Sequence, residues 1–133
     1  MLCSVLSICF AISGVPQVKD GDTLWFNDTH VRIAGIDAEE LNEPNGENAR
    51  RYLLSLVSRS ARIRCTHNGA NSHARKVMTC HTAEGVDLAE YMVRGGWALD
   101  CEAYSRRKYR RYEPEWARSK LMQKPYCDPN HRR

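Results

Sequence analysis

Two aspartates in the first third of the chain are spaced so that they can hold a metal ion beside a phosphate. Asp22 leaves an Asp20-Gly21 turn at the start of a predicted strand, and Asp37 stands where another predicted strand ends. If these strands pair, the two carboxylates converge, and carboxylate oxygens bind hard cations. A cation held there polarises a phosphate ester and neutralises part of its charge.

A glutamate and two arginines can supply the rest of such a site. Glu40 lies three residues beyond Asp37, close enough to activate a water molecule as a general base. Arg32 precedes Asp37 by five residues, and Arg75 opens a different predicted strand. Guanidinium groups grip phosphate through a planar fork and meet the charge of the transition state. Each residue alone is most simply a turn or surface residue, but together they predict a phosphodiester-cleaving site.

These stretches resemble the staphylococcal-nuclease (thermonuclease) family. The similarity runs from about Ser13 to Leu121 and is strongest at the Asp-Gly-Asp-Thr turn and the R-x-x-x-x-D-x-x-E run. Further matches are the Gly46-x-x-Ala49 helix start, residues 85–93 and the Gly-Trp-Ala run at 96–98. The resemblance implies a mainly β fold with α-helices, namely a five-stranded oligonucleotide-binding (OB) barrel with three helices. It also implies calcium-dependent hydrolysis of DNA and RNA that leaves 3′-phosphate ends.

The resemblance also implies roles for individual residues. Asp22 and Asp37 match the carboxylates that bind one Ca²⁺, and Ala38 matches the residue whose main-chain carbonyl is a further ligand. Glu40 matches the proposed general base. Arg32 and Arg75 match the two arginines that contact the phosphate. Tyr104 matches a tyrosine near the nucleotide.

Two stretches depart from the family pattern. The usual Asp-x-Tyr-Gly run before the second arginine is Asn-Ser-His-Ala here, so His73 replaces the nucleotide-contacting tyrosine and Ala74 the glycine. The choice of Arg75 over Lys76 depends on one gap in this region. The usual Thr-Pro after the second metal aspartate is Ala-Glu, and we expect the extra carboxylate of Glu39 to alter metal affinity or oppose the substrate phosphate.

Hydrophobic periodicity and turn residues indicate where the elements lie. Strands are expected within 12–19, interrupted by Pro16, and at 23–26, 30–36, 62–65, 75–81 and 97–99, with loops at 37–45 and 67–74. Helices are expected over 49–57, from an Asp87 cap to Gly95, and from near Glu113. The sequence thus predicts three helices and about five strands, beside the short stretch at 97–99.

Composition places the chain among soluble globular domains. Its 133 residues fit one domain, and 27% charged with 42% hydrophobic residues excludes a disordered, collagen-like or coiled-coil chain. The formal net charge is +4, divided as −3 over residues 1–103 and +7 over 104–133. A basic tail suits a polyanion. The basic run at 106–111, with tyrosines interleaved, leaves open a non-catalytic OB domain that binds nucleic acid.

Residues 1–11 are uncharged and largely apolar, which is typical of the core of an export signal that has lost its basic start. The alternative is a buried first strand. We therefore expect a truncated signal peptide over 1–11, a nuclease-like domain over 12–133, and a secreted or periplasmic protein. DNA and RNA are the expected substrates of a monomer with no membrane or protein partner.

Four cysteines remain after such a signal, an even number that agrees with an oxidising compartment. Of the three possible pairings we favour Cys65–Cys80 and Cys101–Cys127. A zinc site at Cys65, His67, Cys80 and His81 is less favoured, because neighbouring residues of a strand point to opposite faces.

Overall fold

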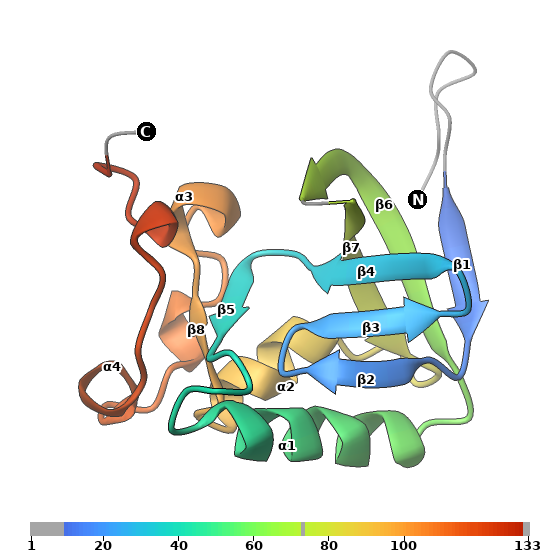
Figure 1. Cartoon of the computed structure of the whole chain (residues 1–133), viewed down its shortest axis with the longest axis horizontal. Helices are drawn as coiled ribbons and strands as arrows, with labels where there is room; N and C mark the ends of the chain where they lie inside the picture. Colours follow the sequence, from blue (N-terminus) through green and yellow to red (C-terminus); the bar gives the residue numbers. More distant parts are fainter. Residues whose placement is uncertain (1–9, 73, 132–133) are drawn as a thin grey trace.

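The computed structural model describes residues 10–72 and 74–131, and its centre is a curled β-sheet with helices packed below it (Figure 1). The described part contains the strands β1 (Ala11–Gly14), β2 (Gln17–Asp20), β3 (Thr23–Phe26), β4 (Thr29–Ile33), β5 (Ile36–Ala38), β6 (Ile63–Ser72), β7 (Arg75–Thr82) and β8 (Ala98–Asp100). Its α-helices are α1 (Gly46–Ser58), α2 (Leu88–Arg94), α3 (Glu102–Ser105) and α4 (Ala117–Lys120). Two 3₁₀ turns complete it, η1 (Arg110–Tyr112) and η2 (Pro125–Cys127).

Six of the strands form one sheet in the order β1-β6-β7-β4-β3-β2. Every pair in it is antiparallel except β4 with β7. Strands β5 and β8 form a separate antiparallel ribbon. Because β5 follows β4 directly, the ribbon begins next to the end of β4, where the predicted site residues lie.

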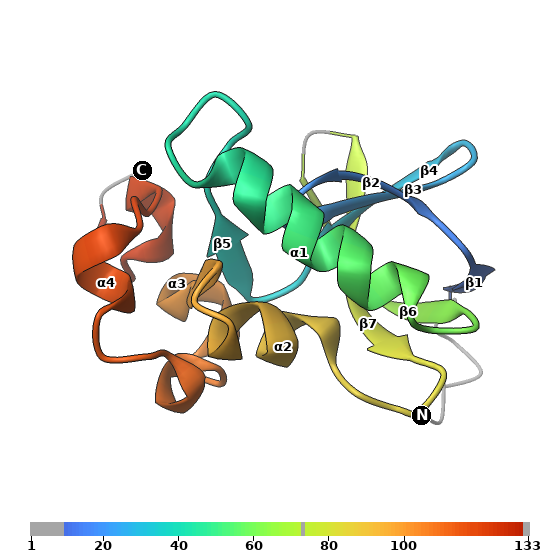
Figure 2. The same cartoon turned by 90° about the horizontal axis from the view of Figure 1, so that it is seen from below.

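Helices α1 and α2 lie side by side, α1 along β2 and α2 against β7, as the view from below shows (Figure 2). The predicted apolar periodicity of the first helix is confirmed, since Ala49, Leu53, Leu56 and Val57 are buried. The predicted cap of the second is also confirmed: Asp87 accepts a hydrogen bond from the Ala89 N–H at 2.9 Å. The segment from α3 onward lies beside the β5–β8 ribbon.

The strand and helix counts differ from the prediction, although a curled, barrel-like sheet fits an OB-like, mainly β architecture with α-helices. Gly35 has φ +81°, and this turn divides the expected strand 30–36 into β4 and β5. The loop expected at 67–74 is wrong, because β6 runs on to Ser72 past a register shift between His67 and Asn71. The helix expected from Glu113 is also wrong: one turn forms at Ala117–Lys120.

Among residues 10–72 and 74–131, two disulfides tie the structure together, and they are the pairs that the sequence analysis favours. Cys65 and Cys80 stand opposite each other on β6 and β7 inside the core. Cys101, just after β8, bonds to Cys127 at the end of η2. Disulfides of this kind fit an oxidising compartment.

The expected signal lies mostly outside the described residues, which begin at Phe10, and Ala11 opens β1. No helix among the described residues combines the length and the apolar character needed to cross a membrane.

Candidate active site

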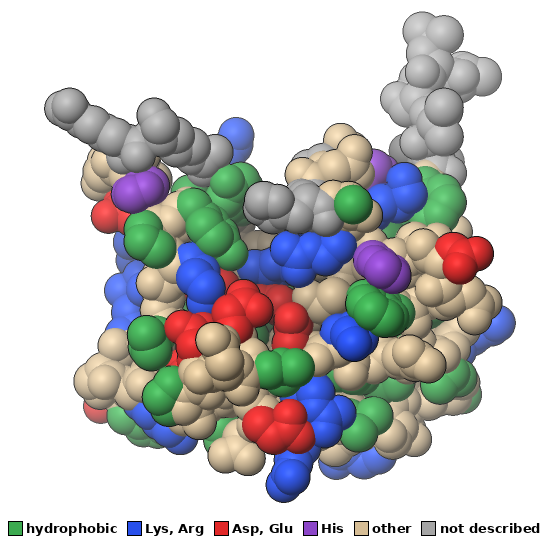
Figure 3. Space-filling model, viewed as in Figure 1, with side chains coloured by type: hydrophobic (Ala, Val, Ile, Leu, Met, Phe, Trp, Pro, Cys, Tyr) green, Lys and Arg blue, Asp and Glu red, His purple; other side chains and the backbone are tan. Residues whose placement is uncertain are grey.

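Three of the predicted site residues meet where β3 begins and β4 gives way to β5. The Arg32 guanidinium lies between the two aspartates, with Nη1 3.4 Å from Asp22 Oδ2 and Nη2 3.7 Å from Asp37 Oδ1. All three side chains are buried. Figure 3 shows acidic side chains gathered in the middle of this face, next to Lys and Arg side chains. The convergence that the sequence analysis made conditional on strand pairing is therefore present.

Backbone and side-chain hydrogen bonds hold the aspartates in place. Asp22 Oδ2 accepts from the Ala38 N–H at 2.9 Å, which ties the first turn to β5. The Ile33 N–H donates to the Asp22 carbonyl at 2.8 Å, which fixes the end of β4 to the same turn. Asp20 accepts from the Asp22 N–H at 3.0 Å. The Asp-Gly-Asp turn thus positions the Asp22 carboxylate and β5, the strand that carries Asp37.

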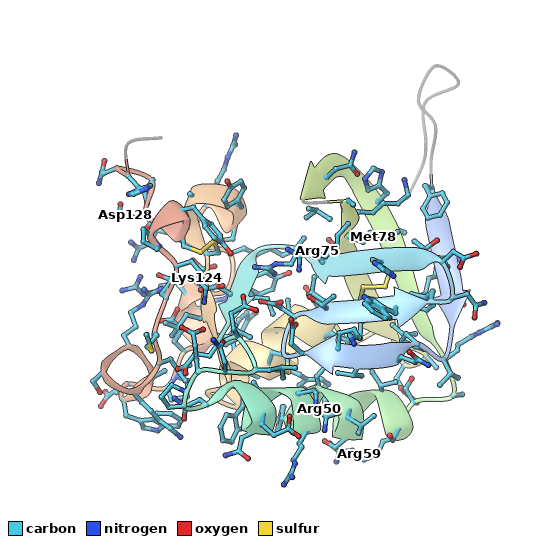
Figure 4. The ribbon with its side chains drawn as sticks, viewed as in Figure 1. Arg50, Arg59, Arg75, Met78, Lys124 and Asp128 are labelled. Carbon is cyan, nitrogen blue, oxygen red and sulfur yellow. A yellow bond between two sulfur atoms is a disulfide. The ribbon has the colours of Figure 1, made fainter. Side chains whose placement is uncertain are left out.

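Arg75 reaches the same site through a threonine. Its Nη1 donates to Thr23 Oγ1 at 3.0 Å, and that hydroxyl lies 3.2 Å from Asp22 Oδ1. Thr23 and Arg32 are paired in the β3–β4 register, and β4 lies beside β7, which starts at Arg75. Figure 4 shows Arg75 and Lys124 on two sides of the site, one from β7 and one from the C-terminal segment.

Glu40 stands in the loop beyond β5, with a side chain that is 55% exposed. Its N–H donates to Glu43 Oε1 at 2.6 Å, and its Oε1 lies 3.9 Å from Lys124 Nζ. A Cβ on Gly46 would overlap the Glu40 carbonyl, so only glycine lets α1 start this close beneath the loop. Glu40 is therefore on the open side of the site, where a water molecule can reach it.

The sequence analysis missed two residues that contact the site, Lys124 and Tyr126. The Lys124 N–H donates to Asp37 Oδ2 at 2.9 Å, and the Tyr126 hydroxyl lies 3.5 Å from Asp37 Oδ1. The cysteines carry the signal that points to them. Asp37 pairs with Leu99 on β8, and the Cys101–Cys127 disulfide just beyond β8 brings residues 124–126 back to that strand pair.

Glu39 has structural partners that the sequence analysis did not predict. Its side chain is 2% exposed and accepts three hydrogen bonds, from Asn45 N, Asn45 Nδ2 and Met122 N at 2.9, 2.8 and 3.0 Å. Glu39 joins the loop after β5 to the C-terminal segment. The effect of this carboxylate on metal affinity or on the substrate phosphate stays a prediction.

Burial and neighbouring charges shift the pKa values of three side chains in and beside the site. The pKa of Asp37 is raised to about 6, mainly because burial removes its carboxylate from water, and the nearby charge of Asp22 adds to this. Burial also raises the pKa of Asp20 to about 6. For Arg32, burial acts to lower the pKa, but the charge of Asp22 and other neighbours outweighs it and the pKa is raised.

The donors suit a hard divalent cation. The carboxylates of Asp22 and Asp37 are oxygen ligands of the kind that Ca²⁺ prefers, and the Ala38 N–H donates to one of them. Among residues 10–72 and 74–131, no cluster of three or more His, Cys, Asp or Glu side chains is arranged to hold a metal. A cation at Asp22 and Asp37 would therefore complete its coordination with water or substrate oxygens.

Of the two residues assigned to the nucleotide, Tyr104 lies on the surface. The Tyr104 ring is 58% exposed and meets the Tyr126 ring edge-on, with centroids 6.3 Å apart. His73 is outside the described residues. In the basic run at 106–111, several cations have local partners: Arg107 pairs with Glu102, Lys108 with Asp87 and Arg110 with Glu113.

Comparison with known proteins gives relatives at low identity. No family model matches the chain. It is 30% identical over 99 residues to the succinoglycan biosynthesis protein ExoI of Rhizobium meliloti, covering 67% of this chain and 52% of that protein. It is 28% identical over 103 residues to uncharacterized endonucleases of Escherichia coli O157:H7 and of Escherichia coli, covering 74% of this chain and 67% of each. The chain thus spans about half the length of the first relative.

Proposed function

We propose that this chain is a calcium-dependent nuclease that hydrolyses phosphodiester bonds of DNA and RNA. The observation that carries the proposal is the contact of one buried arginine, Arg32, with both Asp22 and Asp37. Such an arrangement places a phosphate-binding guanidinium beside a pair of oxygen ligands. Two relatives that are named as endonucleases give independent support.

The side chains divide the work of hydrolysis between them. Arg32 and Arg75 bind the non-bridging oxygens of the phosphate and hold them as negative charge builds. Glu40 takes a proton from a water molecule, whose oxygen then attacks phosphorus. The bond from phosphorus to the 5′ oxygen breaks, and that oxygen takes up a proton. The products are a 3′-phosphate on one fragment and a 5′-hydroxyl on the other.

Charge balance favours the assignment of one Ca²⁺ to Asp22, Asp37 and the Ala38 carbonyl. Bound there, the ion would polarise the phosphate and offset the two carboxylates. Without it, a substrate of negative charge would approach two carboxylates that share the single guanidinium of Arg32. The same reasoning argues against a domain that only binds nucleic acid, since a simple binder gains nothing from acids beside phosphate.

The two disulfides support a secreted or periplasmic location for this nuclease. We propose that it acts as a monomer on DNA and RNA, without a protein partner or a membrane.

Digestion of single-stranded DNA and RNA by the purified chain tests this function. We expect cleavage with calcium and none with a chelator, and we expect phosphatase treatment to remove a 3′-phosphate from the products. The variant Glu40→Gln measures the background. If the wild-type chain cuts neither substrate faster than this variant, the nuclease assignment is wrong.

A further inference from the structure

The C-terminal segment 122–127 crosses the candidate site and is fastened at both ends. At its start, the Met122 N–H donates to the buried carboxylate of Glu39 at 3.0 Å. At its end, Cys127 is bonded to Cys101 and is itself buried. A segment held at two points loses little further entropy when its side chains make specific contacts. The residues between these points are therefore held against the site.

Lys124 joins the part of the site that activates water. Its ammonium group lies 2.9 Å from Glu43 Oε1 and 3.9 Å from Glu40 Oε1, while its N–H holds Asp37. Glu43 in turn accepts the Glu40 N–H at 2.6 Å. One cation thus stands between two carboxylates that would otherwise repel each other.

The distances suit a lysine that positions the Glu40 carboxylate without forming a hydrogen bond to it. Lys124 makes its short hydrogen bond to Glu43, and at 3.9 Å its attraction for Glu40 is electrostatic. The lone pairs of Glu40 therefore stay open to a water molecule.

Tyr126 lies on the phosphate-binding part of the site. Its hydroxyl lies 3.5 Å from Asp37 Oδ1, the same oxygen that Arg32 Nη2 approaches at 3.7 Å. Its ring is 39% exposed and contacts Tyr104. The same short segment therefore reaches the residues assigned to metal, phosphate and water.

We infer that residues 122–127 form one side of the active site and take part in its function. Lys124 is the positioning residue for Glu40, and Tyr126 is the positioning residue for Arg32. This inference rests on the proposed nuclease function. Loss of the Lys124 charge leaves Glu40 free to turn away from the attacking water, so the chemical step slows while substrate binding is kept. Loss of the Tyr126 hydroxyl loosens Arg32, so phosphate binding weakens.

The test compares Lys124→Met, Lys124→Arg and Tyr126→Phe with wild type, using a single-stranded oligonucleotide and calcium. Lys120→Met is the matched control, because Lys120 lies over the Trp97 and Trp116 rings. We expect Lys124→Met to lower kcat at least ~10-fold with KM changed less than about 2-fold, since misplaced general bases lose much of their effect. Lys124→Arg should recover most of the rate, and Tyr126→Phe should raise KM at least about 3-fold.

A second readout does not depend on turnover. The melting-temperature rise given by Ca²⁺ with thymidine 3′,5′-bisphosphate should be kept in Lys124→Met and reduced in Tyr126→Phe. The inference is overturned if Lys124→Met keeps the wild-type kcat, or if Lys124→Arg is as slow as Lys124→Met and both melt well below wild type, which is the pattern of a purely structural segment. Failure of the wild-type chain to cut at all would instead reject the nuclease function.

Discussion

The Glu39 carboxylate offers a sharp test, because one buried side chain holds the loop after β5 to the C-terminal segment. Oε1 accepts the Asn45 N–H, and Oε2 accepts both Asn45 Nδ2 and the Met122 N–H. Glu39→Gln keeps the shape of the side chain but replaces one oxygen with an NH₂ group, which cannot accept. Whichever way the amide turns, at least one buried donor loses its acceptor.

The magnitude follows from these three bonds. A buried donor left without an acceptor costs roughly 1–3 kcal/mol, and bonds to a charged acceptor are worth more than bonds to a neutral one by up to about 1 kcal/mol. The free energy of unfolding should therefore fall by about 2–4 kcal/mol. For a domain of this length about 3–5 °C of melting temperature corresponds to 1 kcal/mol, so the expected decrease is roughly 10 °C.

Thermal melting followed by circular dichroism measures this change. Glu84→Gln is the matched control, since Glu84 is exposed in the turn before α2 and should leave the melting temperature unchanged. The rate of oligonucleotide cleavage should fall with Glu39→Gln as well, because Met122 anchors the segment that carries Lys124. Equal melting temperatures for Glu39→Gln and Glu84→Gln would show that this carboxylate does not join the two segments.

Three further perturbations probe the site from other directions. Arg32→Met leaves buried carboxylates without their cation and should lower the free energy of unfolding by roughly 3 kcal/mol in urea denaturation; an unchanged midpoint would contradict the ion pairs. Replacing both Cys101 and Cys127 with serine should lower the free energy of unfolding by about 3.5 kcal/mol, given their separation of 26 residues, and should also slow cleavage. A wild-type kcat in this variant, if it is folded, would contradict a role for segment 122–127. The raised pKa of Asp37 favours the folded state below pH 3.8, and this contribution is lost as pH rises through about 6. In chelator, the stability of Asp37→Asn relative to wild type should therefore rise between pH 4 and 7, and a flat difference would contradict the burial of a charged carboxylate.

Local patterns in the sequence were sufficient for the elements that depend on near neighbours. The spacing of Ala49, Leu53 and Val57 fixes the buried face of α1, and Asp87 caps α2 through a bond to a residue two positions away. Strand pairing also favoured Cys65–Cys80, because both cysteines lie in adjacent strands.

Contacts between distant residues were harder to predict. Lys124 and Tyr126 reach Asp37 across 87 and 89 positions of the chain, and no periodicity reports such a contact. The partners of Glu39, Asn45 and Met122, were likewise not predicted, and Met122 lies 83 positions away.

The departures in secondary structure have local causes that a pattern of apolar residues does not register. The positive φ of Gly35 turns the chain between β4 and β5, and the alternation of Val31 and Ile33 does not show where β4 ends. The polar residues of β6 pair with β7 through backbone bonds, as Asn71 does with Lys76, so polarity alone wrongly indicated a loop.

The central claim is that side chains from the turn before β3, from β4, β5 and β7, and from the loop after β5 cleave phosphodiesters around a bound calcium ion. The most direct measurement is the initial rate of oligonucleotide cleavage by wild type, Glu40→Gln and Glu47→Gln. Glu47 is a partly exposed carboxylate that pairs with Arg50 and Arg51 on α1. We expect wild type and Glu47→Gln to cut at equal rates with calcium, and Glu40→Gln to be at least about 100-fold slower, as for loss of a general base. Equal rates for the two variants, or wild-type cleavage that persists in chelator, would contradict the account.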